Sequence, residues 1–389
     1  MSIYATLGVP EIINACGTVT RLSGGLMAPE VAEAMRQASL ACVDMVTLQA
    51  AASRTIRDAT GAEAGIATSG ASAAVLLGTA AILAGLDPAK MNALPETPDG
   101  RRDFLMVRSQ RNMYDKALVV AGARIIEIGI PDRYSGPGVR DAAPWELEAA
   151  ITKNTAGIYY LAGAQSKPSL REIATIAREH RLPILVDAAG QLPPAANLHR
   201  FLDEGADLVA FSGGKAIGGP QSSGILAGRA DLVASALLQM LDLDVFEDAW
   251  SPPAEFAPLR QMRGLPHHGI GRSCKIGKEE IAGLCAALQR FTATDEAARR
   301  ATWLARLQRI ATLAGGNGLS IEGSAIPVLA LKTPNLDTAM ALARRLAAGT
   351  PAIHCGLGRR DEGILTFNPV ALTDAHAEEI GKRLAEREG

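Results

Sequence analysis

The stretch DLVAFSGGKAIGGPQSSGILAGR (207–229) places one lysine, Lys215, in a run of glycines and serines between two apolar segments. The segments 208–213 and 224–227 are short and almost continuously apolar, which is typical of strands covered on both faces. A lysine flanked by glycines at the end of a strand suggests a phosphate loop or a lysine held for covalent chemistry. The alternative is a solvated loop residue.

The spacing around Lys215 does not fit a nucleotide loop. The pattern G-x-x-x-x-G-K-[ST] requires a glycine where Val209 stands and a hydroxyl residue where Ala216 stands. No G-x-G-x-x-G follows an early strand, and the sequence contains no H-E-x-x-H. The sequence therefore supports neither a P-loop, nor a dinucleotide-binding fold, nor a zinc-protease helix.

Strand-like and helix-like segments alternate through the first part of the chain. We expect strands at 104–109, 124–130, 156–162, 183–188, 208–213 and 224–227, with helices at 114–121 and 170–180. Such alternation predicts an α/β domain with a mainly parallel sheet and right-handed crossovers.

The character of the chain changes after residue 228. A helix at 230–243 is followed by the proline-rich break at 251–253, and a long helix is expected at 278–314. Strands at 326–331 and 363–367, with helices at 336–348 and 374–387, indicate a smaller α+β domain. We therefore expect a large domain at 46–250 and a small domain at 251–389, with the N-terminal segment 1–45 packing on the small domain.

Composition narrows the class of protein. The chain has 389 residues, is 48% hydrophobic and 21% charged, and carries a net charge of -2, which predicts a globular protein with no overall attraction to nucleic acid. The N-terminus lacks a signal-peptide pattern, and the most apolar run, 71–86, predicts a buried helix. The five cysteines are widely spaced, so we expect reduced thiols, no metal site and a cytoplasmic location.

Two further segments complete a possible cofactor site with Lys215. Asp187 ends the strand in ILVDAAGQ, at the sheet edge where α/β proteins bind ligands. The segment IATSGASAA (66–74) turns from a short strand into a helix, whose N-terminus favours a phosphate. Pyridoxal phosphate (PLP) requires these three parts: a lysine for the Schiff base, a carboxylate beside the pyridine nitrogen and a phosphate cradle. Each of these three features alone is weak evidence for PLP; an aspartate at the end of a strand, for example, is often a helix cap. The order of phosphate turn, aspartate and lysine along the chain is much more specific for a PLP site.

The chain resembles the fold-type I PLP-dependent enzymes. Within them it is similar to the selenocysteine synthase (seryl-tRNA selenium transferase)-like group, which includes D-glucosaminate-6-phosphate ammonia-lyase. The resemblance covers residues 10–290 well and the C-terminal part loosely. The matching stretches are INACGTVTRLSGG (13–25), VDMVTLQAAASRTIRDATGAEAGIATSGASAAVLLG (43–78), VDAAGQLPP (186–194), DLVAFSGGKAIGGPQSSGILAGR (207–229) and HHGIGRSCKIGKEEIAGLCAAL (267–288).

The resemblance implies roles for particular residues. Lys215 would form the internal aldimine, and Asp187 would pair with the pyridinium nitrogen. Where the family often has a histidine before YDKAL, able to stack on the cofactor ring, this chain reads Arg111-Asn112-Met113. The remaining cofactor-binding residues would be Ser69, Gly70, Ala71, Ser72 and Ser212 at the phosphate and Gln191 near the phenolic oxygen.

The basic stretch RQMRGLPHHGIGRSCK (260–275) is a candidate anion site. Arginine suits bidentate capture of a carboxylate or phosphate, either of the substrate or of a neighbouring subunit's cofactor. The matched family motif favours Arg272, with His267 and His268 beside it, and Arg360 in CGLGRRDEG is a second candidate. The alternative interpretations are a solvated linker and a polar turn.

These observations predict a PLP-dependent enzyme that acts on a small anionic amino acid or amino sugar acid. Elimination of water and ammonia through a quinonoid is the reaction we favour, by resemblance, and the same residues would serve a racemase or an aminotransferase. A seryl-tRNA selenium transferase-type enzyme is less favoured, because the matched core begins close to Met1 and leaves no room for a tRNA-binding domain. A protein that keeps the fold without catalysis is disfavoured by the presence of both Lys215 and Asp187.

We expect a homodimer or a higher even oligomer that binds neither nucleic acid nor membrane. Fold-type I enzymes generally complete their sites from a neighbouring subunit. The segment INACGTVTRLSGG (13–25) has the small residues of an interface segment.

Overall fold

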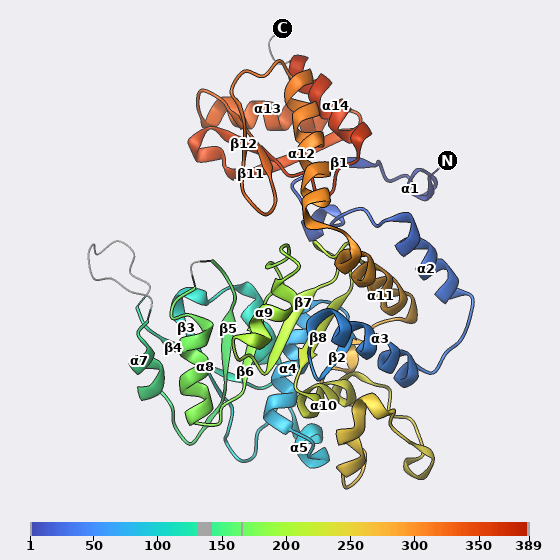
Figure 1. Ribbon diagram of the computed structural model, residues 1–389, viewed down its shortest axis with the longest axis vertical. Coiled ribbons are helices and arrows are strands. Elements are labelled where there is room, and N and C mark those ends of the chain that lie inside the picture. Colours follow the sequence, from blue (N-terminus) through green and yellow to red (C-terminus); the bar gives the residue numbers. More distant parts are fainter. Residues whose placement is uncertain (1, 131–141, 165, 387–389) are drawn as a thin grey trace. The chain divides into compact units, whose positions relative to one another are not determined.

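The computed structural model describes residues 2–130, 142–164 and 166–386. Its elements form two compact units (Figure 1). One unit consists of Ala28–Thr292, and the other joins the two ends of the chain, Met1–Met27 and Ala293–Gly389. Each unit has its own sheet and its own apolar core.

The larger unit is built on a seven-stranded sheet in the order β2-β8-β7-β6-β5-β3-β4. The pairs from β7 to β4 are parallel, whereas β8 runs antiparallel to both β2 and β7. The prediction of an α/β domain with a mainly parallel sheet is therefore confirmed. The strands are β2 (Ala64–Thr68), β3 (Asp103–Val107), β4 (Arg124–Ile128), β5 (Thr155–Leu161), β6 (Ile184–Asp187), β7 (Leu208–Ser212) and β8 (Gly224–Gly228).

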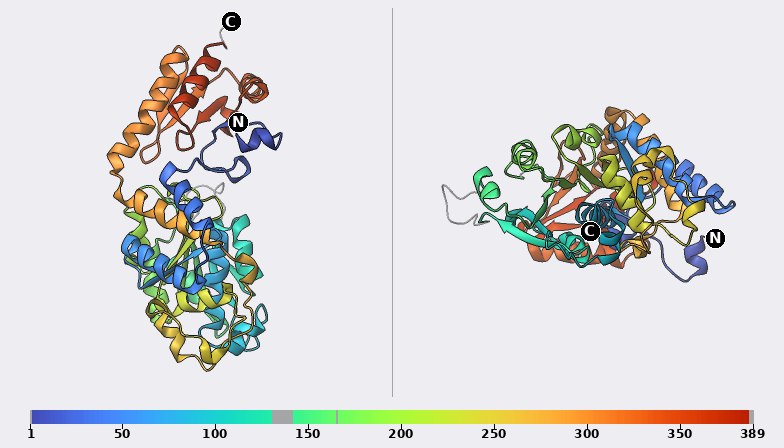
Figure 2. Two further views of the ribbon diagram at one scale, coloured as in Figure 1. Left: turned by 90° about the vertical axis from the view of Figure 1, so that its right-hand side faces the viewer. Right: turned by 90° about the horizontal axis from the view of Figure 1, so that it is seen from below.

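Helices cover both faces of this sheet (Figures 1 and 2). Helix α4 packs against β5, β6, β7 and β8, and α10 packs on α4, while α3 and α9 contact each other and strands of the sheet. The central strands are buried at nearly every position, which explains their continuous apolar sequences. The helices of this unit are α2 (Pro29–Ser39), α3 (Met45–Thr60), α4 (Ala71–Ala84), α5 (Pro88–Ala93), α6 (Lys116–Val120), α7 (Pro144–Ala149), α8 (Leu170–Glu179), α9 (Asn197–Asp203), α10 (Ala230–Met240) and α11 (Lys278–Ala293).

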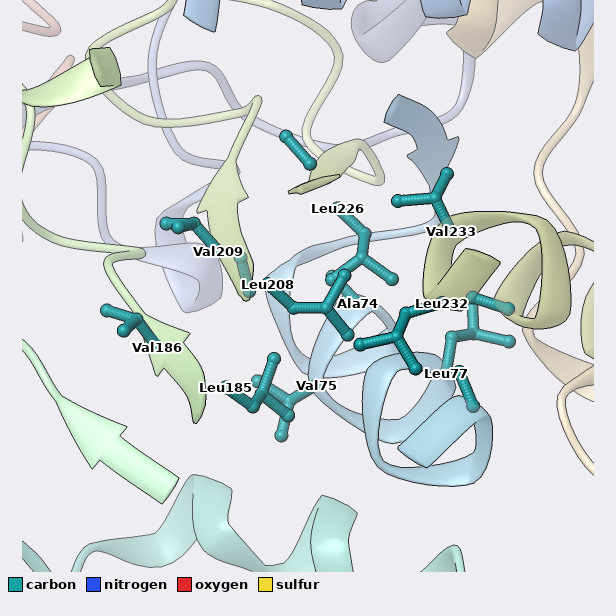
Figure 3. Packing of buried hydrophobic residues seen from close by; sticks show 14 of the residues in the cluster. Ala74, Val75, Leu77, Leu185, Val186, Leu208, Val209, Leu226, Leu232 and Val233 are labelled. Carbon is teal, nitrogen blue, oxygen red and sulfur yellow. The ribbon is translucent and has the colours of Figure 1, made fainter. Parts of the chain in front are cut away.

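The core between α4 and the sheet fixes the strands that carry the candidate site. Figure 3 shows Ala74 and Val75 of α4 beside Leu185 of β6 and Leu208 of β7. All four side chains are at most 1% exposed. Burial of a leucine stabilises the fold by about 1.5–3 kcal/mol, so β6 and β7 are held firmly against α4.

Helix α4 is apolar on all sides, as predicted for a buried helix. It has 14 residues, and most of them are buried in the core. Among the residues that the structure describes, no helix is long and apolar enough to cross a membrane.

The smaller unit is built on a five-stranded sheet in the order β1-β11-β12-β10-β9. Strand β1, from the N-terminal segment, pairs in parallel with β11, and the other pairs are antiparallel. The two ends of the chain therefore share one sheet. Its strands and helices are β1 (Ile12–Ala15), β9 (Leu319–Glu322), β10 (Val328–Lys332), β11 (Ala352–Arg359), β12 (Ile364–Phe367), α1 (Ile3–Thr6), α12 (Glu296–Leu313), α13 (Leu336–Ala348) and α14 (Asp374–Ala385).

The boundaries between the two units differ from the domain boundaries that we predicted from the sequence. Residues 28–45 and 251–292 belong to the unit of the large sheet, whereas we expected them in the N-terminal segment and the small domain. The reason is burial: Phe256, Leu259, Ile281 and Leu284 are at most 3% exposed and lie in the core of the large unit.

The long helix expected at 278–314 is two helices. Helix α11 ends at Ala293, and α12 begins at Glu296. Between them, the Asp295 carboxylate accepts a hydrogen bond from the backbone N–H of Ala298 at 2.8 Å. An aspartate that caps a helix start in this way offers the backbone an alternative to a continuous helix.

Candidate active site

The loop that carries Lys215 is compact rather than flexible. The Gly213 N–H donates to the Ser223 carbonyl and the Gly219 N–H donates to the Gly213 carbonyl, both at 2.9 Å. The Lys215 carbonyl accepts from the Gly218 N–H at 3.0 Å. The side chain of Lys215 is half-buried, and within the described part of the chain it forms no ion pair. Its amine is therefore not committed to a neighbouring carboxylate.

Asp187 lies at the end of β6, the strand next to β7. Its backbone is in register with Ala210 of β7, so both strands end at the same edge of the sheet. Asp187 is 6% exposed, and its Oδ1 atom accepts from the Ala189 N–H at 2.9 Å. Since none of the described cationic residues pairs with it, this is a buried carboxylate that lacks an opposite charge.

Tyr159 is a member of the site that the sequence analysis missed. Its hydroxyl donates to Asp187 Oδ2 at 3.0 Å from the neighbouring strand β5. Burial, followed by the charge of Asp187, raises the pKa of the Tyr159 hydroxyl, so it stays protonated and remains a donor. The available signal was a pair of tyrosines in the otherwise apolar strand segment AGIYYLA (156–162).

The predicted phosphate turn joins β2 to α4. Gly70 precedes α4 with φ of +142°, and a Cβ at this position would meet no atom within 4 Å. The N-cap residue of α4, Gly70, has no side chain that could accept from the N–H groups of the first turn, and Ser72 in that turn is exposed. Backbone N–H groups at an open helix start are suited to a phosphate.

Two neighbours support this turn. Gly224 begins β8, and a Cβ there would lie 2.4 Å from the Gly70 carbonyl carbon and 2.7 Å from the Ala71 nitrogen. Only glycine therefore lets β8 pass so close to the turn. Gly224 is paired with Thr68 on one side and with Ser212 on the other, which brings half-buried Ser212 to the same edge.

Two of the expected polar contacts are directed elsewhere. The Ser69 hydroxyl donates to the Cys274 carbonyl at 2.9 Å, so its hydrogen is already committed. The Gln191 side-chain amide donates to the Ala162 carbonyl at 2.7 Å, and its backbone carbonyl accepts from Asn197 at 2.6 Å. Gln191 therefore braces the loop after β5, and its expected position near the phenolic oxygen stays a prediction.

In the fold, two residues of the basic stretch (260–275) pair with acidic residues. The Arg272 guanidinium lies 2.7 Å from Asp242 Oδ2, and this hydrogen bond holds the pKa of the Asp242 carboxyl below its usual range. His268 Nε2 lies 3.6 Å from Asp244 Oδ1. His267 is exposed, and its backbone N–H donates to Asn92. Asp242 and Asp244 offset part of the positive charge on which we predicted an anion site. The roles of Arg272, His267 and His268 in binding an anion remain predictions.

Arg360 belongs to the smaller unit. Its Nη1 donates to the Leu357 carbonyl at 3.3 Å, and its Nε lies 3.9 Å from Asp361 Oδ1. These local contacts match the polar turn that we considered as the alternative interpretation, and the substrate role of Arg360 stays a prediction.

The segment at the expected stacking position is held by charge pairs. Arg111 pairs with Asp115, with Nε and Oδ2 2.5 Å apart, and also with Glu127. Asn112 and Asp115 cap each other's backbone, and Met113 is exposed. Because Arg111 is committed to two carboxylates, nothing in these contacts assigns it to a cofactor ring.

The residues present fit PLP on two observations. A buried carboxylate without a cationic partner matches the protonated pyridine nitrogen. An open helix start next to Gly70 matches the phosphate. Both lie at the edge of the sheet from which the Lys215 loop begins.

Comparisons with known proteins agree with this geometry. The chain is 30% identical over 403 residues to a 5'-C-glycyluridine monooxygenase-decarboxylase from Streptomyces sp, covering 98% of this chain and 91% of that protein. It is 30% identical over 298 residues to a D-glucosaminate-6-phosphate ammonia lyase from Salmonella typhimurium, covering 75% and 70%. A solved structure of D-glucosaminate-6-phosphate ammonia-lyase matches with a TM-score of 0.81 at 27% identity, over 99% of this chain and 98% of that one.

The fold and the family follow from the remaining matches. A serine palmitoyltransferase structure from S. paucimobilis, with bound PLP, has a TM-score of 0.55 at 12% identity over 97% of this chain and 87% of that one, so the fold is that of fold-type I enzymes. The profile described as SelA, L-seryl-tRNA selenium transferase, matches residues 12–244, which is more than half of the chain. The resemblance inferred from the sequence is confirmed. The chain belongs to the L-seryl-tRNA selenium transferase family of PLP-dependent enzymes.

Proposed function

We propose that the protein is an ammonia-lyase that acts on a small, anionic hydroxyamino acid or amino sugar acid. The observation that carries this proposal is the convergence of the Lys215 loop, Asp187 and the start of α4 at one edge of the large sheet. The likeness to an ammonia-lyase structure along 99% of the chain supports the choice of reaction.

Particular residues would hold the cofactor. The first turn of α4 and Gly70 would bind the phosphate, Asp187 would face the ring nitrogen, and the Lys215 amine would bind the aldehyde carbon. When bound, PLP joins the substrate amino group and withdraws electron density from the α-carbon.

The side chains of the protein then move protons. With the cofactor bound, Lys215 Nζ would take the proton from the substrate α-carbon, because no carboxylate among the described residues pairs with this amine. Asp187 would favour a proton on the ring nitrogen by its negative charge. The proton taken by Lys215 would leave with the β-hydroxyl as water, and one water would return when ammonia leaves. The net change is a hydroxyamino acid to a 2-keto acid and ammonium.

A second candidate reaction is oxidative decarboxylation of an amino acid. It is favoured by the similarity, along 98% of this chain, to the monooxygenase-decarboxylase from Streptomyces sp. That reaction would consume dioxygen and release carbon dioxide, whereas the lyase reaction consumes no oxidant.

One experiment separates these reactions. The purified holoenzyme is incubated with L-serine, D-serine, D-glucosaminate and D-glucosaminate 6-phosphate, while ammonia, keto acid, carbon dioxide and dioxygen are followed. We expect ammonia and keto acid in equal amounts with one or more of the sugar acids, and none with Lys215→Ala. Release of carbon dioxide with dioxygen uptake would instead establish the second candidate, and racemised or transaminated product without ammonia would refute the lyase.

We also propose that the protein works on a small molecule as a homodimer or a higher even oligomer. Sedimentation of the active holoenzyme tests the assembly, and an active monomer would contradict it. A gel shift with tRNA tests the partner, and tight binding of tRNA would favour the transferase reaction instead.

A further inference from the structure

We infer that Tyr159 is a positioning residue that keeps the Asp187 carboxylate aimed at the cofactor's pyridine nitrogen. This inference rests on the proposed role of Asp187, but not on the lyase reaction. Tyr159 acts through Asp187 and would itself touch neither substrate nor cofactor.

The geometry restrains both oxygens of the carboxylate. The Tyr159 hydroxyl donates to Oδ2 at 3.0 Å from β5, and the Ala189 N–H donates to Oδ1 at 2.9 Å from the turn after β6. Two donors on opposite oxygens define the rotation of the carboxylate about its Cβ–Cγ bond. The remaining lone pairs are left for a third donor, such as a protonated ring nitrogen.

Burial makes the Tyr159 hydrogen bond strong. Tyr159 is 1% exposed and Asp187 is 6% exposed, so water does not replace the bond. A hydrogen bond from a neutral donor to a carboxylate is charge-assisted, and such bonds are shorter and stronger than those between neutral groups. A carboxylate held in this orientation would favour, by its negative charge, the protonated form of a pyridine nitrogen placed against it.

The chain supplies a matched control one residue away. Tyr160 lies on the same strand, is 5% exposed, and points to the opposite face of the sheet. The pKa of its hydroxyl is also raised by burial, and its contact is with Ser166 rather than Asp187. Tyr160→Phe therefore removes a hydroxyl of the same kind at nearly the same depth without touching the carboxylate.

The test measures the cofactor without any substrate. Apoproteins of wild type, Tyr159→Phe and Tyr160→Phe are loaded with PLP labelled with ¹⁵N in the ring, and the ring ¹⁵N shift and the dissociation constant of PLP are measured. For Tyr159→Phe we expect the ¹⁵N signal to move toward unprotonated pyridine and the dissociation constant to rise about tenfold, as for the loss of one buried charge-assisted hydrogen bond. Tyr160→Phe should match the wild type in both measurements.

The same measurements in an Asp187→Asn background separate positioning from a general structural role. There Tyr159→Phe should change neither value further, because its effect passes through the carboxylate. An equal loss of affinity in both backgrounds, or an unchanged ¹⁵N signal in Tyr159→Phe, would overturn the inference. Neither readout depends on lyase activity, so failure of the proposed reaction stays distinguishable.

A second measurement applies if Tyr159→Phe does not fold. 3-Fluorotyrosine is placed at position 159 or at position 160, and the ¹⁹F signal is recorded as PLP binds. We expect the signal at position 159 to shift on binding and the signal at position 160 to move little. Equal shifts, or no shift at position 159, would overturn the inference.

Discussion

Replacing Asp187 by Asn keeps the shape of a buried side chain and removes its charge. The amide oxygen can accept from the Ala189 N–H, as the carboxylate does now at 2.9 Å. The amide nitrogen can donate to the Tyr159 oxygen, which then loses an acceptor for its own hydrogen. Because most hydrogen bonds are preserved, we expect the free energy of unfolding to fall by no more than about 2 kcal/mol.

The effect on the proton-transfer step should be much larger. Asp187 is 6% exposed, so water does not replace the lost charge. Removal of one preorganised electrostatic group at a reacting centre costs about 2.7–4 kcal/mol, or roughly 10²- to 10³-fold in rate. PLP should remain bound, because Lys215 and the turn at Gly70 are unchanged.

The assay is exchange of the substrate α-proton for deuterium in D₂O, followed by proton NMR with saturating PLP. Exchange isolates the proton-transfer step from later release of ammonia. A control is Asp337→Asn, which changes an exposed carboxylate in the first turn of α13, and it should exchange at the wild-type rate. If Asp187→Asn exchanged within about threefold of the wild type, Asp187 would not be the partner of the ring nitrogen, and the assignment of the site would be refuted.

Three further predictions test the turn, the helix break and the thiols. Gly224→Ala places a Cβ 2.4 Å from the Gly70 carbonyl carbon, so it should shift the turn and weaken PLP binding at least about tenfold in a fluorescence titration; unchanged affinity would contradict the phosphate role of the turn. Asp295→Ala removes the cap of α12 and should lower the free energy of unfolding in urea by about 1 kcal/mol, whereas no change would show that the cap is dispensable. Burial raises the pKa of the Cys285 thiol to about 11 and that of Cys355 to about 12, so both should resist alkylation at pH 8. Their reactivity should appear only as the pH rises toward those values, and rapid labelling of the folded protein at pH 8, mapped by mass spectrometry, would contradict this burial.

Much of the large unit could be predicted from local sequence. Apolar runs of strand length followed by helical patterns placed β3, β5, β6, β7 and β8 within a few residues of their observed bounds. Parallel strands end at a common edge, so the positions of Asp187 and Lys215 at strand ends were enough to predict that both follow strands at that edge. This inference needs only the order of the elements and not their side-chain packing.

The contact between Tyr159 and Asp187 needed the register of the sheet. Adjacent tyrosines on a strand point to opposite faces of the sheet. The sequence does not say which of the two lies on the same face as the Asp187 side chain of β6. The observed register places the Tyr159 hydroxyl, and not that of Tyr160, on the carboxylate. A shift by one residue would exchange the two.

The basic stretch shows what only the tertiary structure decided. Along the chain, Arg272 and His268 stand in a segment dense in positive charge, which indicates an anion site. In the fold, Asp242 and Asp244 come from the segment that follows α10 and pair with them. The sequence alone determined strands, helix starts and the lysine–aspartate order, because these depend on neighbouring residues. Packing decided the charge pairs and the boundary between the units, because they join residues that are distant along the chain.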